Sequence, residues 1–101
     1  MRHLTNAQRQ HLRRLAHQIK PVVQIGKQGL TDNVRLNVDR ALETHELIKV
    51  KFLDFQDQKA ELTGDLVRTT GSVLIGLVGN IATLYREQPD RDKRKIRLPY
   101  A

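Results

Sequence analysis

The sequence has no cysteine, no tryptophan and a single serine among its 101 residues. Without cysteine there is no disulfide framework, no thiol nucleophile and no zinc site built on thiolates. The lone Ser72 stands in no nucleophile-elbow pattern and has no histidine near it in the sequence. The four histidines form no i, i+4 pair of the kind that binds zinc from a helix. These absences indicate a protein that is not an enzyme and needs neither a metal nor a cofactor.

Long apolar runs are also missing. The longest stretch, Val73 to Val78, is far shorter than the roughly 20 residues of a membrane span, and the N-terminus lacks an apolar signal segment. We therefore expect a cytoplasmic protein with no membrane partner. The length and the 39% hydrophobic content predict one folded domain, residues 1–101. Its core should span about residues 1–86, and residues 87–101 should form a basic tail that we expect to be unpacked apart from Ile96 and Leu98.

Acidic residues are absent from the first 31 positions. The net charge is +7, and six of the 18 basic residues precede Asp32, whereas the other 70 residues hold 12 basic and 11 acidic groups. A segment of one sign attracts a polyanion in a way that mixed surface charge does not. A smaller basic run occupies the tail and includes Arg91, Lys93, Arg94, Lys95 and Arg97.

Capping residues and apolar spacing predict the first half of the fold. The first helix begins after Thr5, which forms a capping box with Gln8, and its apolar stripe extends to Ile19 before Pro21 stops it. A buried strand over 22–25 follows, and Thr31 caps a second helix. Residues 47–52 then alternate as a strand, with Lys49 and Lys51 on its wet face.

The second half of the sequence predicts one more helix and two strands. The helix covers 58–70 and ends at Gly71, a residue suited to a left-handed cap. Strands over 72–78 and 81–86 flank Gly79-Asn80, which suits a two-residue hairpin turn. The fold class is therefore α/β, in the order α-β-α-β-α-β-β.

The most informative short motif is Gly26-Lys27-Gln28-Gly29, between the first strand and the second helix. Glycines allow a sharp turn and a close approach of the main chain to a ligand, and the helix that follows points unpaired amides toward the loop. This chemistry suits phosphate. The P-loop spacing is absent, so a string of phosphates fits better than a nucleotide. An ordinary strand-to-helix turn is the alternative interpretation.

The first helix carries a basic flank. At 100° per residue, Arg9, Arg13, His17 and Lys20 fall on one side, while Arg14 points more nearly away from the core. No acidic neighbour relieves their repulsion, which favours an anionic partner over a merely solvated surface. Since Lys20 leads into the strand that ends at Gly26, the flank and the glycine loop could be continuous.

Aromatic residues number only four. Phe52 is expected in the core, Tyr85 gives little support for base stacking, and the other two are Phe55 and Tyr100. A sheet that stacks bases needs two or three exposed aromatics on its central strands. The sequence therefore favours recognition of nucleic-acid backbone and shape over reading of bases.

A set of segments follows in a characteristic order along the chain: Gly26–Gly29, Leu30–Leu42, His45–Lys51, Thr70-Gly71, Leu84–Arg86 and Arg94–Pro99. Together these segments resemble the bacterial YhbY family, the stand-alone CRM (chloroplast RNA splicing and ribosome maturation) domains. The resemblance implies three helices on a four-stranded mixed sheet, similar to the C-terminal domain of initiation factor three. It also implies RNA binding through the Gly-x-x-Gly loop and the adjoining basic surface, with precursors of the large ribosomal subunit as partners.

Our hypothesis from the sequence is thus a monomeric RNA-binding domain that docks on rRNA during ribosome assembly. An adaptor whose basic surface meets an acidic protein is the alternative. The candidate RNA-binding residues are Gly26, Lys27, Gln28, Gly29, Arg9, Arg13, Lys20, Arg14 and His17.

Overall fold

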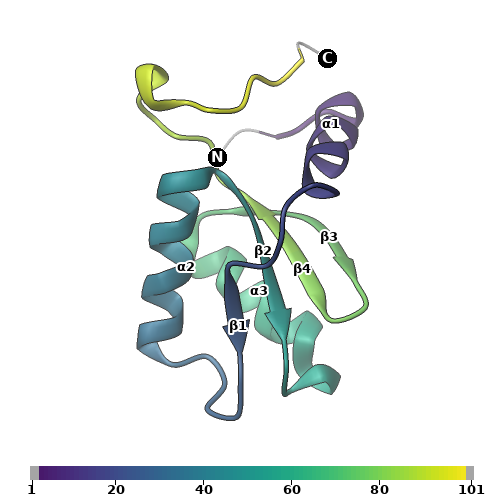
Figure 1. Ribbon diagram of the computed structural model, residues 1–101, viewed down its shortest axis with the longest axis vertical. Coiled ribbons are helices and arrows are strands. Elements are labelled where there is room, and N and C mark those ends of the chain that lie inside the picture. The colour runs from purple at the N-terminus through teal and green to yellow at the C-terminus, as the bar shows by residue number, and fades with distance from the viewer. Residues whose placement is uncertain (1–2, 100–101) are drawn as a thin grey trace.

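The computed structural model describes residues 3–99, and their helices and strands follow the predicted order (Figure 1). Two short 3₁₀ helices, η1 (Gln56–Gln58) and η2 (Arg91–Lys93), add to the predicted elements. The α/β fold class is confirmed. The main elements are α1 (Asn6–Ala16), β1 (Val23–Ile25), α2 (Asp32–His45), β2 (Leu47–Phe52), α3 (Lys59–Thr70), β3 (Val73–Val78) and β4 (Ile81–Tyr85).

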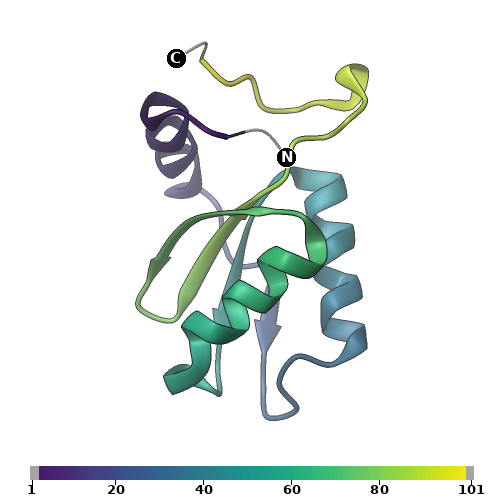
Figure 2. The ribbon, with the colours of Figure 1, turned by 180° about the vertical axis from the view of Figure 1, so that it is seen from behind.

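The four strands form one mixed sheet in the order β1-β2-β4-β3. β1 runs parallel to β2, and the other pairs are antiparallel. Helices α2 and α3 cover one face, while α1 lies over one end of the opposite face (Figures 1 and 2). The remainder of that opposite face lies beyond the cluster that packs under α1.

The larger core lies between the sheet and helices α2 and α3. Val50 and Phe52 are fully buried there, as the alternation of β2 predicts, and they meet Val38 and Leu42 from α2 and Leu66 from α3. Each such side chain contributes roughly 1.5–3 kcal/mol by leaving water. This core fixes the position of β2, which carries lysines on its other face.

The strand register sorts the opposite face into three rows, because directly paired residues point to the same side of a sheet. The first row is covered by Leu12 and Ala16 of α1, whereas the second and third are left open. The rows are Leu47–Tyr85–Val73, Lys49–Thr83–Gly76 and Lys51–Ile81–Val78.

Helix α1 begins as predicted and ends earlier than predicted. The Thr5–Gln8 capping box is present, but the helix ends at Ala16, with His17 as its cap. The next amides donate to carbonyls three residues back, a tighter turn that brings Ile19 onto the core under α1. Placing Lys20 on the flank of this helix was therefore wrong, since it lies in the connection to β1.

The tail is packed, and a buried carboxylate holds it. Glu46, only 1% exposed, accepts hydrogen bonds from the amides of Gln88 at 2.9 Å, Lys95 at 2.7 Å and Ile96 at 3.0 Å. Ile96 and Leu98 pack on the core beneath α1, as expected for these two residues. Residues 87–98 therefore return across the end of the domain that carries α1 (Figure 1).

An ion-pair cluster joins α3 to α2. Asp65 accepts from Arg35 at 2.8 Å and also contacts Arg68. The hydrogen bond from Arg35, with the nearby charges, lowers the pKa of Asp65 below its ordinary value of 3.8. A lowered folded-state pKa gives stability that is present above the unfolded pKa and is lost as pH falls through the folded one.

This arrangement predicts how Asp65→Asn changes acid sensitivity. The variant should be less stable than wild type at pH 7, and the difference should shrink as pH falls below about 4. Urea denaturation at pH 7 and at about pH 3 measures both differences. A gap that stays constant between the two pH values would show that the ion pair does not titrate with folding.

Candidate nucleic-acid interface

The glycine loop connects β1 to α2 and is closed by its own backbone. The Gly29 amide donates to the Gly26 carbonyl at 3.0 Å, and Gly29 has φ +70°. A Cβ at Gly29 would meet the ring of Phe55 at 3.4 Å, whereas a Cβ at Gly26 would meet nothing within 4 Å. Gly29 is thus required by the turn itself, and Gly26 leaves open space beside the main chain.

Lys27 and Gln28 are exposed in this loop. The β1–α2 loop lies at the bottom of Figure 1. The first turn of α2 follows the loop directly. Its free amides could bind an anion, but side chains of the protein itself already occupy part of this end of the helix. Thr31 accepts from the Val34 amide at 3.1 Å, and Asp32 places a carboxylate at the positive end of the helix. The cation available for a phosphate at this loop is therefore Lys27.

Two predicted arginines of α1 have structural contacts. Arg9 donates through Nη1 to the Leu74 carbonyl at 3.1 Å, and Arg13 donates through Nε to the Ile75 carbonyl at 3.3 Å. β3 is an edge strand whose register shifts between Leu74 and Gly76, so Ile75 is the extra residue of a bulge. Both arginines bind α1 to this irregular edge, and each keeps further N–H groups for a ligand.

A hollow of about 310 Å³ lies on the open face below the end of α1. Arg13 and His17 from α1 line it together with Lys49 from β2. It exists partly because Gly76, paired with Thr83, puts no side chain over this part of the sheet. Lys49 was not among the predicted binding residues, although the strand alternation had placed it on the wet face.

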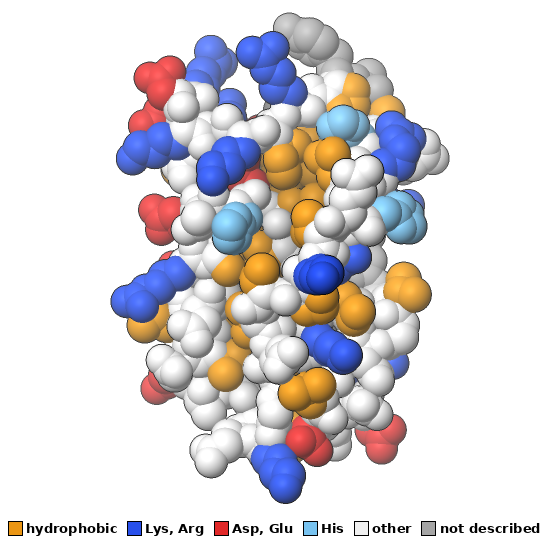
Figure 3. Space-filling view, in the orientation of Figure 1, with side chains coloured by type: hydrophobic (Ala, Val, Ile, Leu, Met, Phe, Trp, Pro, Cys, Tyr) orange, Lys and Arg blue, Asp and Glu red, His pale blue; other side chains and the backbone are white. Residues whose placement is uncertain are grey.

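The loop and the basic end of α1 are not adjacent. They lie toward opposite ends of the sheet, with the α1–β1 connection and β2 between them (Figure 1). Lys20 belongs to that connection, and Lys49 and Lys51 belong to β2. Figure 3 shows basic side chains along this face, with acidic ones mainly toward its margins. The structure therefore makes β2, as well as Lys20, the link between the two predicted regions. Arg14 is exposed on α1.

These cations are electrostatically uncompensated. In the part of the chain that the structure describes, the ion pairs within 4 Å involve Arg35, Arg68, Arg86 and Arg94, and none involves a basic residue of this face. Residues 3–99 also contain no group of three metal-ligating side chains and no helix suited to cross a membrane. The site is an open basic surface. Arg2 lies outside the described residues.

The aromatic residues form no stacking platform on the sheet. Phe52 is fully buried, as expected, and Tyr85 is only 1% exposed, so neither can stack on a ligand. Phe55 is 40% exposed, and its ring lies against Gly29. Tyr100 lies outside the described residues. The described surface of the sheet is thus suited to phosphate contacts.

A family model described as the CRS1 / YhbY (CRM) domain matches residues 4–86. Relatives align beyond that range, along nearly the whole chain. Probable RNA-binding protein YqeI of Bacillus subtilis is 37% identical over 97 residues, covering 95% of this chain and 99% of the relative. A Haemophilus influenzae protein named RNA-binding protein is 38% identical over 97 residues, covering 95% of each.

A solved structure supports the same relationship. The solution structure of the Staphylococcus aureus protein SAV1595 superposes with a TM-score of 0.76 and 40% sequence identity. It covers 96% of this chain and 100% of its own. The fold is therefore shared over nearly the whole chain.

Proposed function

Because this chain belongs to the CRS1 / YhbY (CRM) domain family, we propose that it binds the rRNA of precursor large ribosomal subunits and acts in their assembly. The relatives are named for RNA binding and not for a reaction, which supports a docking module rather than an enzyme. In this proposal the protein acts as a monomer in the cytoplasm.

The observation that carries the proposal is the uncompensated basic face. Lys27 projects at the glycine loop, Lys49 and Lys51 follow on β2, and Arg13 and His17 complete the surface at α1. Phosphate contacts of this kind supply most of the sequence-independent affinity of nucleic-acid binding and make it salt dependent. RNA helices are recognised largely through backbone and shape. An extended row of cations fits that form of recognition.

Lys27→Ala tests the loop directly. It should weaken binding to a large-subunit rRNA fragment and reduce the slope of log K against log salt concentration by about one unit. Arg40→Ala is a matched control, because Arg40 is an exposed cation of α2 outside the proposed surface. Fluorescence titration at several salt concentrations gives both quantities. Equal slopes for the two variants would argue against a phosphate contact at Lys27.

Substitutions at the two glycines should have different effects, one on RNA binding and the other on stability. Gly26→Val should weaken RNA binding about fivefold or more, because its side chain fills the space that a phosphate would approach, while stability changes by about 0.5 kcal/mol or less. Gly29→Ala should lose about 1–2 kcal/mol of stability, since it forces a side chain to positive φ. Thermal melts and titrations of both variants test this. Normal binding by a folded Gly26→Val would favour the plain-turn interpretation.

The adaptor hypothesis predicts a different dependence on RNA. If the basic face docked an acidic protein, association with ribosomal particles would survive nuclease digestion of accessible RNA. Our proposal predicts that digestion releases the protein. Sedimentation before and after nuclease treatment separates the two.

A further inference from the structure

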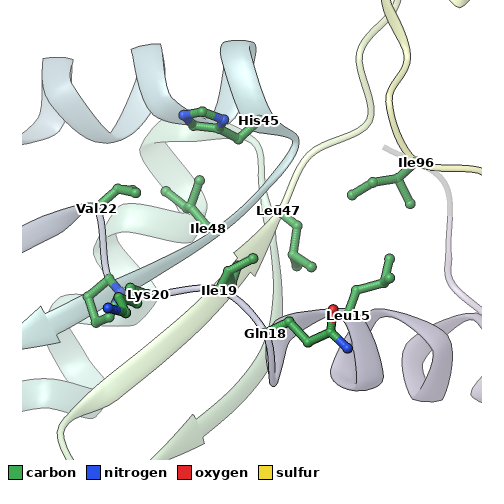
Figure 4. Close-up of a pocket in the computed structure, with 10 residues that line it drawn as sticks. Leu15, Gln18, Ile19, Lys20, Val22, His45, Leu47, Ile48 and Ile96 are labelled. Atoms are coloured by element: carbon green, nitrogen blue, oxygen red, sulfur yellow. The ribbon is translucent and has the colours of Figure 1, made fainter.

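A second hollow, of about 610 Å³, opens beside the C-terminal end of α1 (Figure 4). Its walls come from four separate parts of the chain: α1 and its connection to β1, the end of α2, the start of β2 and the tail. Figure 4 shows Leu15, Leu47 and Ile96 around the opening and His45 at the α2 side. The hollow is mainly apolar, and its polar groups are few and at the rim. The lining residues are Leu15, Gln18, Ile19, Lys20, Pro21, Val22, His45, Leu47, Ile48 and Ile96.

The apolar surface here is unusually accessible for aliphatic residues. Val22 is 52% exposed and Leu15 is 37% exposed. Beside them stand an amide on Gln18, an ammonium on Lys20 and an imidazole on His45. Unpaired RNA bases are held by contact with flat or apolar surfaces, with rings such as histidine, and by hydrogen bonds to their edges, while cations hold the adjacent phosphate. This hollow supplies each of these groups.

The tail completes the site. Ile96 forms one wall, and its position is set by Glu46, whose carboxylate accepts from the amides of Lys95 and Ile96. Lys95 and Arg97, which flank Ile96 along the chain, are exposed and do not line this hollow, and Lys95 lines a separate one with Glu43 and Asp92. Glu46 is thus a positioning residue that holds the Ile96 wall in place.

We propose that this hollow accepts the base of an unpaired nucleotide of the bound RNA, with the neighbouring phosphate on Lys20. The inference rests on the proposed function and adds a base-contacting subsite to the phosphate-binding face. The charge of Lys20, which has no ion-pair partner among the described residues, favours a nucleotide over an apolar protein segment as the occupant. Only the unstacked part of the RNA would enter, so this end of the domain distinguishes unpaired from paired RNA.

Methyl NMR on the full chain tests the subsite, because the hollow is lined by methyl-bearing residues. Single-stranded RNA tetranucleotides of each of the four bases are titrated into protein labelled at Ile, Leu and Val methyls. Shifts are expected at Leu15, Val22 and Ile96 and not at Leu36, an exposed residue of α2 away from both hollows. Ribose 5-phosphate should leave the first set unmoved. Equal shifts with ribose 5-phosphate, or none with any tetranucleotide, would overturn the proposal.

A pair of variants makes the test specific. His45→Ala should weaken tetranucleotide binding at least about fivefold. A loss of this size is at the lower end of the range expected when a ring that contacts a base is replaced by alanine. Leu36→Ala removes an exposed side chain of α2, away from both hollows, and should leave tetranucleotide binding unchanged. Equal affinities for the two variants would overturn the subsite, as would methyl shifts seen only with an apolar peptide.

The same samples distinguish this proposal from the wider function. Salt-dependent binding of the structured rRNA fragment that is weakened in Lys27→Ala, without tetranucleotide shifts in the hollow, would refute the subsite and leave the proposed function standing. Absence of fragment binding would refute the function itself.

Discussion

Replacing Lys27, Lys49 and Lys51 together with alanine is expected to weaken binding to large-subunit rRNA roughly a hundredfold, at about 1 kcal/mol for each exposed phosphate contact. The salt slope should fall by about three units, because three phosphates would no longer displace counterions. Fluorescence titration of one rRNA fragment across a salt series measures both effects. The fold should persist, since Lys27 and Lys51 are exposed and Lys49 points to the open face.

The matched control keeps the charge and changes only the side chain. A variant with arginine at the same three positions should retain most of the affinity and the wild-type slope. Circular dichroism melts establish that both variants are folded. A triple-alanine variant that binds with an unchanged slope would show that RNA does not contact this face.

Glu46→Ala is expected to destabilise the domain by about 3 kcal/mol, because it removes a buried carboxylate that accepts three amide hydrogen bonds. The tail would then lose the attachment that holds Ile96 and Leu98 on the core beneath α1. Hydrogen exchange should show faster exchange at Lys95 and Ile96 than in β2 or β4. Urea denaturation measures the loss of stability.

Glu46→Gly separates the carboxylate from the backbone. Glu46 has φ +66° at the C-cap of α2, a conformation that glycine adopts more readily than alanine. The glycine variant should therefore be about 1 kcal/mol more stable than the alanine variant, while its tail amides exchange equally fast. Protection of these amides in either variant would show that contacts other than the carboxylate hold the tail.

The helices and strands were predictable because their signals are local. The Thr5–Gln8 box, the Thr31 cap and the Gly71 cap each lie within a few residues of the backbone they fix, and all three are present. The alternation of residues 47–52 likewise gave the bounds of β2 and the wet face of Lys49. Such patterns do not require knowledge of the rest of the chain.

The end of α1 was less predictable. Pro21 restricts the residue before it, which placed the end of the helix near Lys20. The observed end at Ala16 depends on Ile19 reaching the core under α1, a tertiary contact that the spacing of apolar residues does not reveal. The displaced Lys20 then lines the hollow beside α1 instead of extending its basic flank.

The features that could not be predicted from the sequence depend on contacts between distant segments of the chain. Arg9 and Arg13 reach the carbonyls of a bulge some 60 residues away, and the bulge itself carries no evident sequence signal. In the sequence, Glu46 cannot be told from a surface acid at a helix end, yet its side chain is buried and its carboxylate holds the tail. Likewise, Lys49 joins Arg13 and His17 only because the strand order places β2 beside β4, under the end of α1. His45 likewise meets the other residues of the hollow beside α1 only in the folded chain.

Crosslinking in cells is the measurement that addresses the central claim most directly. Protein crosslinked to RNA by ultraviolet light is purified, and the attached RNA is sequenced. We expect crosslinks concentrated in large-subunit rRNA, and their loss in the Lys27, Lys49 and Lys51 triple-alanine variant. Crosslinks that are absent from rRNA, or that persist in this variant at wild-type level, would contradict it.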